Sequence, residues 1–207
     1  MKKSIALSLV MLFGCEAANA TVIVSTDPGD FATTLEAFPV TGFSNNNIVS
    51  SSGNITLDNA QGIGNPATTT AAYTNWGGSI LSGTEYVMSG DENFDVLFSS
   101  LQTAFAMNYE DDSISSIFTL TFFNGVSNVG TASFVTTSFN TDNFIGFISD
   151  TDFNKVTVRE NDGGSNSNEY FQFYTATPAV SVPEPGTLAL MGLGLAGLGF
   201  RRKRRAA

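Results

Sequence analysis

The sequence predicts an all-β domain, built as an antiparallel β-sandwich or jelly roll. Ser115 to Phe123 alternates polar and apolar residues, which is the period of a half-buried strand. Asn124-Gly125 follows as a strong turn signal before β-type residues resume at Val126. Further runs of this kind recur at intervals of about 8–12 residues, a spacing typical of sandwiches and jelly rolls. No long 3.6-residue period is found between residues 21 and 182.

Each remaining strand is predicted from a run of β-branched and aromatic residues between clusters of turn-forming residues. Asp150-Thr151-Asp152 predicts a polar turn between two such runs, because Lys155 stands where a calcium-binding EF-hand loop needs glycine. Residues 44–70 predict a long loop with one short strand at 55–57. The many Phe residues are predicted to form the core. The other predicted strands are Glu85–Met88, Phe94–Phe98, Thr103–Tyr109, Phe144–Ser149, Phe153–Glu160 and Tyr170–Thr175.

Residues 1–20 are predicted to be a secretory signal peptide with a helical apolar core. Two lysines precede an apolar run at residues 5–13, and Ala18 and Ala20 form a small-residue cleavage site. Cleavage at this site makes Thr21 the first residue of the mature protein.

Cys15 is the single cysteine of the chain and falls within the predicted signal peptide. After cleavage the mature domain has no cysteine, so its stability has to come from the core without disulfides. Lipidation of Cys15 is the alternative, because Leu12-Phe13-Gly14-Cys15 partly resembles a lipoprotein box.

The C-terminal tail, residues 181–207, has three parts in series. Pro183, Glu184 and Pro185 form an extended element, because proline lacks a donor N–H and disfavours helix in the residue before it. An apolar run from Leu188 to Phe200 is predicted to be a short hydrophobic helix that inserts into a membrane. A basic cluster retained on the cytoplasmic side follows: Arg201, Arg202, Lys203, Arg204 and Arg205.

The apolar part of the tail is short for a membrane span. The 14 residues from Thr187 to Phe200 extend roughly 21 Å as a helix. A bilayer core of about 30 Å asks for about 20 residues. A weak anchor of this length suits a transient processing signal, and a permanent membrane anchor with the β domain in the periplasm is the alternative.

This tail resembles the PEP-CTERM sorting signal of Gram-negative bacteria in its Pro-Glu-Pro element, apolar run and basic cluster. The resemblance implies export through the secretion machinery and an inner-membrane intermediate held by the tail. It further implies processing by an exosortase and delivery to the outer surface or extracellular matrix. Tails of this kind also carry the label of ice-binding protein C-terminal domains, but Thr68-Thr69-Thr70 is too little support for ice binding.

The domain predicted between the two signals, residues 21–180, is strongly acidic. Lys155 and Arg159 are its only bases, against seventeen acidic residues, which gives a formal charge of about −15. That balance excludes nucleic acid and anionic lipid as partners, because both bind basic patches.

Candidate binding residues lie in two segments of the domain. Tyr73 and Trp76 could form an aromatic platform for a sugar ring, although a single Trp is at least as often part of a core. Asp91, Glu92 and Asp95 could supply oxygen ligands for Ca²⁺ if their loops converge, with solvated turn charges as the alternative.

The sequence favours a non-catalytic role that needs no cofactor. The chain has no His, which removes Ser-His-Asp triads and His-ligated metal chemistry. Residues 144–160 loosely resemble a segment of jelly-roll ectodomains that are similar to carbohydrate-binding modules. We therefore expect an exported surface protein that binds polysaccharide in an extracellular matrix, with a small glycan-active enzyme as the less favoured alternative.

Overall fold

The described part of the chain is an antiparallel β structure with one short 3₁₀-helix. All pairs of neighbouring strands run antiparallel, and backbone hydrogen bonds join eleven strands into one branched sheet. This confirms the predicted all-β class. The computed structural model describes residues 21–41, 47–58, 67–69, 85–87, 93–111, 116–136, 143–161 and 169–179.

Two of the strands are much longer than the rest, at 18 residues each. The 3₁₀-helix η1 (Pro28–Asp30) lies between the first two strands. In chain order the strands are β1 (Val22–Ser25), β2 (Phe31–Leu35), β3 (Ile48–Val49), β4 (Ile55–Asp58), β5 (Ala67–Thr69), β6 (Glu85–Val87), β7 (Phe94–Asp111), β8 (Ile117–Asn124), β9 (Ser127–Val135), β10 (Asn143–Glu160) and β11 (Glu169–Pro178).

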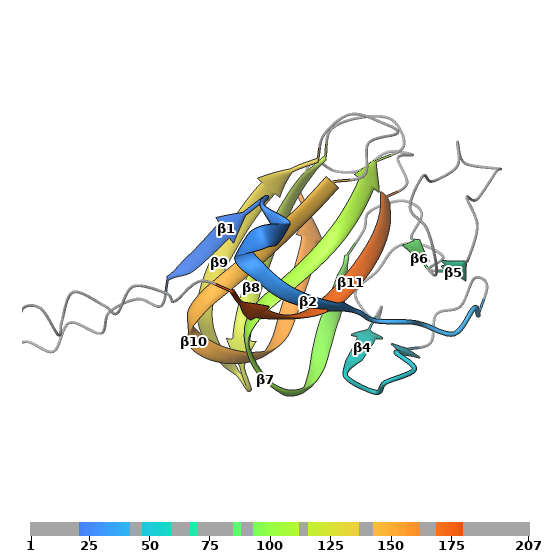
Figure 1. The fold of residues 1–207 in the computed structure, drawn as a ribbon, viewed down its shortest axis with the longest axis horizontal. Helices are drawn as coiled ribbons and strands as arrows, with labels where there is room; N and C mark the ends of the chain where they lie inside the picture. Colours follow the sequence, from blue (N-terminus) through green and yellow to red (C-terminus); the bar gives the residue numbers. More distant parts are fainter. Residues whose placement is uncertain are drawn as a thin grey trace, which may run out of the picture.

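The long strands β7 and β10 pair with each other and take part in two layers. Layer A consists of β2, β11, the second half of β7, the first half of β10, and β1. The short strand β6 pairs with the start of β11 in this layer, and β5 pairs with β6. Layer B consists of β3, β4, the first half of β7, the second half of β10, β8 and β9. The pairing of β7 with β10 shifts register between Ile148 and Lys155, where the two layers meet. Figure 1 shows both strands curving around one end of the molecule.

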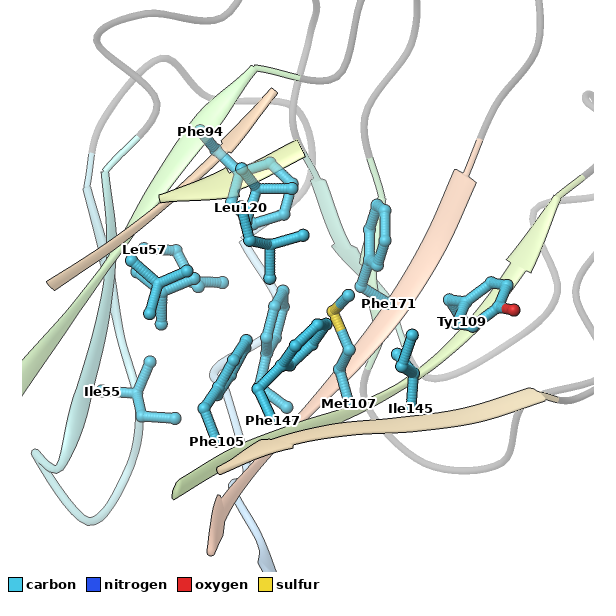
Figure 2. Close-up of a cluster of buried hydrophobic side chains, with 14 of the residues drawn as sticks. Ile55, Leu57, Phe94, Phe105, Met107, Tyr109, Leu120, Ile145, Phe147 and Phe171 are labelled. Carbon is cyan, nitrogen blue, oxygen red and sulfur yellow. The ribbon is translucent and has the colours of Figure 1, made fainter. Parts of the chain in front are cut away.

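The core between the layers is rich in aromatic side chains (Figure 2). Phe105 of β7 stacks on Phe147 of β10 at 6.1 Å between ring centroids, and Phe94 meets Phe171 edge-on at 5.4 Å. Each fully buried Phe contributes about 1.5–3 kcal/mol of hydrophobic stabilisation, with about 0.5–1.5 kcal/mol more for a well-oriented aromatic pair. The other Phe residues with no exposed surface are Phe118, Phe122, Phe153 and Phe173.

The outer face of layer A carries small residues beneath a crossover segment, residues 26–30. This segment connects β1 on one edge of the layer to β2 on the other, so it has to cross the face between them, and Figure 1 shows η1 in front of the sheet there. A Cβ at Gly146 would collide with the ring of Phe31, which is buried at the end of the crossover segment. Ala104, Ala106 and Ala176 also present short side chains on this face, which leaves room for the crossover segment.

The alternating pattern of the central hairpin is confirmed. Phe118, Leu120 and Phe122 of β8 have no exposed surface, while the residues between them face outward. The turn is one residue later than predicted: β8 extends through Asn124, which pairs with Ser127 of β9. Gly125 then adopts a φ of 59°, which favours glycine at the first turn position.

The prediction of separate strands on either side of residues 99–102 and 150–152 was wrong. Each pair of runs is one continuous strand, β7 or β10, and Asp150-Thr151-Asp152 lies inside β10. The polar residues there accommodate a local irregularity in strand pairing, which bends the strand without ending it. Polar residues at a bend and polar residues at a turn look alike in sequence.

Other differences concern the short strands at the sheet margins. The predicted loop at 44–70 contains β3 and β5 as well as the expected β4, and β1 and β2 were not predicted. Within the described ranges, no helix has the length and hydropathy that crossing a membrane requires. The expected signal helix and C-terminal hydrophobic helix lie outside those ranges.

We predict that Gly146→Ala destabilises the protein by about 1–3 kcal/mol, because the added methyl group collides with the buried ring of Phe31. The free energy of unfolding from denaturant titration measures the effect. In a Phe31→Ala background the same substitution should cost much less, since the ring is gone. Ser133→Ala, at an exposed position of β9, is the control. Equal costs of Gly146→Ala in both backgrounds would contradict the packing of Phe31 on the sheet.

Candidate functional site

The outer face of layer A has a hollow beside the crossover segment. Its volume is about 300 Å³, and it is lined by two aromatic rings, an amide, a hydroxyl and a proline. We call it the aromatic hollow. Its lining residues are Pro28, Thr33, Asn108, Phe144 and Tyr174.

Strand register explains why these side chains share one face. Phe144 of β10 lies directly opposite Asn108 of β7, so both point to the same side of layer A. Tyr174 of β11 is opposite Ala106, one step along the same face of β7. The small side chain of Ala106 leaves the space between the larger residues open. The hollow thus results from the short side chains that the sheet needs beneath the crossover segment.

The aromatic rings of the hollow are held by their neighbours. The ring centroids of Phe144 and Tyr174 are 6.2 Å apart with a 57° angle between the planes. Phe144 also packs against Phe31, at 5.6 Å. The side-chain amide nitrogen of Asn108 donates a hydrogen bond to the Tyr174 hydroxyl oxygen at 2.9 Å. This bond fixes the orientation of both side chains before any ligand arrives.

The chemistry of the hollow suits a ligand with both apolar and hydroxyl-bearing surfaces. Small-molecule sites are mostly apolar, with a few placed polar groups that set orientation. Here the faces of Phe144 and Tyr174 provide the apolar part, and the amide of Asn108 and the hydroxyl of Thr33 provide the polar part. Each side chain is at least partly accessible to solvent.

Asp95, one of three acidic residues considered for calcium, lies in an ion pair instead. Its carboxylate accepts a hydrogen bond from the Arg159 guanidinium at 2.6 Å on the outer face of layer B. Arg159 also donates to the Phe94 carbonyl oxygen at 2.7 Å. The described ranges contain no group of three or more His, Cys, Asp or Glu residues placed to hold a metal ion. Asp91 and Glu92 lie outside those ranges.

The second half of β10 alternates buried and outward side chains. Val156 and Val158 have no exposed surface, and Lys155 and Arg159 point to the opposite, outer face of layer B. The Lys155 ammonium lies 4.6 Å from the centroid of the Phe123 ring, a cation–π contact between opposed residues of β10 and β8.

Glu36 is a buried carboxylate that ties the end of β2 to the β3–β4 hairpin. Only 3% of Glu36 is exposed. Its carboxylate accepts hydrogen bonds from Ser52, from the Asn54 amide at 3.0 Å and from the Thr175 hydroxyl at 3.2 Å. This network joins the end of β2, the turn between β3 and β4, and β11, and neutral donors satisfy the charge.

The same network shifts the acidity of Glu36. Burial raises the pKa of this carboxyl, but hydrogen bonds from Ser52, Asn54, Ser50 and Thr175 outweigh it. The pKa is therefore below its ordinary value of 4.5, because these donors favour the ionised form.

Most residues predicted for a site lie outside the described ranges. These include Tyr73 and Trp76 of the suggested sugar platform, Ala18 and Ala20 of the cleavage site, and the whole sorting tail. Thr21, the predicted mature N-terminus, is described, and its backbone N–H donates to an Asp150 carboxylate oxygen at 3.1 Å.

The aromatic hollow was missed because Phe144 was assigned to the core with the other Phe residues, and Tyr174 was given no role beyond its predicted strand. Phe144 precedes the buried Ile145, and Tyr174 follows the buried Phe173. Strict alternation along these two strands could have placed both rings on the outer face. Nothing in the pattern shows that the two strands lie on either side of β7, which is what brings the rings together.

Comparison with known proteins identifies the tail. Residues 181–205 match the PEP-CTERM protein-sorting motif, which confirms the resemblance seen in the sequence. This signal implies a protein that is exported, sorted by exosortase and delivered to the cell surface. No curated protein matches the chain significantly.

Solved structures show only distant likeness. A mutant of a family 29 carbohydrate-binding module is similar with a TM-score of 0.36 and 10% identity, covering 75% of this chain and 99% of that one. The enzymatically active domain of tailspike protein 4 of bacteriophage CBA120 has a TM-score of 0.26 and 12% identity. That match covers 74% of this chain and 18% of the tailspike chain.

We predict that Glu36 makes the free energy of unfolding depend on pH. Because folding lowers the pKa of Glu36, its ionised carboxylate stabilises the fold at pH values above its ordinary pKa of 4.5. This stabilisation is lost as the pH falls through the lower pKa of the folded protein. Denaturant titrations over this pH range should show wild type losing more unfolding free energy than Glu36→Gln. Parallel curves for the two proteins would contradict the network.

Proposed function

We propose that this chain is an exosortase-sorted surface protein whose β domain binds polysaccharide without modifying it. The observation that carries the proposal is the PEP-CTERM motif at residues 181–205, which implies export and surface delivery. A protein placed outside the cell by this route encounters polysaccharide of the surface and matrix. The inner-membrane intermediate, held by the short apolar run, belongs to the same proposal.

Polysaccharide binding is supported by the aromatic hollow. A pyranose ring has apolar C–H faces and a rim of hydroxyl groups. The aromatic faces of Phe144 and Tyr174 suit the first, and the amide of Asn108 suits the second. The Asn108–Tyr174 hydrogen bond holds these groups in place in advance, which lowers the entropy lost on binding.

A non-catalytic role is supported by the residue types in the chain. There is no His, and the one Cys falls in the predicted signal peptide. General acid–base and nucleophilic mechanisms most often use these two residues or paired carboxylates. The hollow itself is lined by no carboxylate.

We predict that alanine at Pro183, Glu184 and Pro185 blocks processing of the tail. In a host that carries exosortase, the variant should keep a heavier mature mass and remain in the membrane fraction. The same host lacking exosortase gives the matched control, because wild type should there behave like the variant. Unchanged mass and fractionation in the variant would contradict sorting through this element.

A second prediction concerns the domain. The exported protein should bind at least one polysaccharide in a retention or pull-down assay and should release no reducing ends from it. Release of product that is lost on substitution of a single carboxylate would favour the enzyme alternative instead.

A further inference from the structure

The distribution of positive charge limits what the aromatic hollow can bind. Between residues 4 and 200 the sequence contains two bases, Lys155 and Arg159. All other bases of the chain lie in the predicted signal peptide or in the basic end of the sorting tail. No loop of the domain, whether described or not, can therefore bring another Lys or Arg to the hollow.

Both of these bases lie on the other layer of the fold. Lys155 and Arg159 belong to the second half of β10, which pairs with β8 in layer B. Phe144 of the hollow belongs to the first half of the same strand, in layer A. Each base is also engaged where it stands, with Arg159 paired to Asp95 and Lys155 placed over a Phe ring.

The crossover segment beside the hollow carries negative charge. The crossover segment that supplies Pro28 to the lining also carries Asp27 and Asp30. An anionic ligand would meet repulsion from these two carboxylates and no compensating Lys or Arg.

We propose that the aromatic hollow binds a neutral pyranose unit of a polysaccharide and discriminates against uronate and sulfate-bearing sugars. This inference rests on the proposed polysaccharide-binding function and adds its site and ligand class. The C–H surfaces of the sugar pack against the rings of Phe144 and Tyr174, whose planes are 57° apart, and the sugar hydroxyl groups bond to Asn108 and Thr33. The hollow has a volume of about 300 Å³, at the lower end of the range of about 300–1,000 Å³ for small-molecule sites. This size limits the contact to one or two sugar rings.

Discrimination follows from desolvation as well as from repulsion. A carboxylate that leaves water for a partly enclosed site loses hydration, and only a paired cation or several donors can replace it. A hydroxyl group loses far less and is satisfied by one amide or hydroxyl partner. The hollow offers partners of the second kind alone.

The test compares matched neutral and acidic polymers. The exported protein is titrated with galactan and with polygalacturonate, and likewise with glucan and polyglucuronate, in buffers with Ca²⁺ and with a chelator. At least one neutral polymer should bind at least about tenfold more tightly than its uronate counterpart. Equal or tighter binding of the uronate in either buffer would overturn the neutral-ligand assignment.

Variants locate the site. Phe144→Ala and Tyr174→Ala should each weaken binding of the neutral polymer about tenfold or more, and Asn108→Ala should do so to a lesser extent. Tyr174→Phe keeps the ring but loses the hydroxyl that accepts from Asn108, so its loss should be smaller than that of Tyr174→Ala. Phe123→Ala, which removes a ring from the outer face of layer B, is the matched control and should bind as wild type.

The outcomes separate the two proposals. Thermal unfolding of each variant shows which of them remain folded, and Tyr174→Phe provides a conservative change if an alanine variant does not fold. A wild-type protein that binds no polysaccharide contradicts the proposed function and this inference together. A wild-type protein that binds, with folded hollow variants that bind equally well, overturns the assignment of the site and leaves the proposed function standing.

Discussion

The fold depends on two long strands that belong to both layers at once. The inward side chains of β7 and β10 supply aromatic rings to both halves of the core, with Phe94 and Phe105 on one strand and Phe147 and Phe153 on the other. The layers therefore cannot separate without breaking continuous strands. In a domain predicted to have no disulfide after export, this sharing of strands takes the place of a covalent link between the sheets.

The same arrangement determines where a ligand site can form. Because β1 and β2 lie on opposite edges of layer A, the chain between them crosses the outer face of that layer. The sheet beneath this crossing has to carry short side chains, which Gly146 and the nearby alanines provide. The aromatic hollow is the space left beside the crossing. The outer face of layer B is different, since it carries both bases of the domain and the Arg159–Asp95 ion pair.

Local pattern predicted much of the fold and little of the site. Alternation in β8 gave the correct buried face, because a two-residue period is a local property. The bends of β7 and β10 were interpreted as turns, since polar residues serve both. Phe144 was assigned to the core by its apolar character alone. Alternation beside the buried Ile145 could have placed it on the outer face. Its meeting with Tyr174 depends on which strands lie beside β7, and a single sequence does not contain that information in a readable form.

The central claim is that an exported β domain holds a neutral sugar on the outer face of layer A. The most direct measurement is a nuclear magnetic resonance titration of the exported protein with a neutral oligosaccharide cut from a polymer that it binds. The account predicts that the largest chemical-shift changes occur at Phe144, Tyr174 and the Asn108 side-chain amide. Changes centred instead on Lys155 and Phe123, across the outer face of layer B, would contradict it.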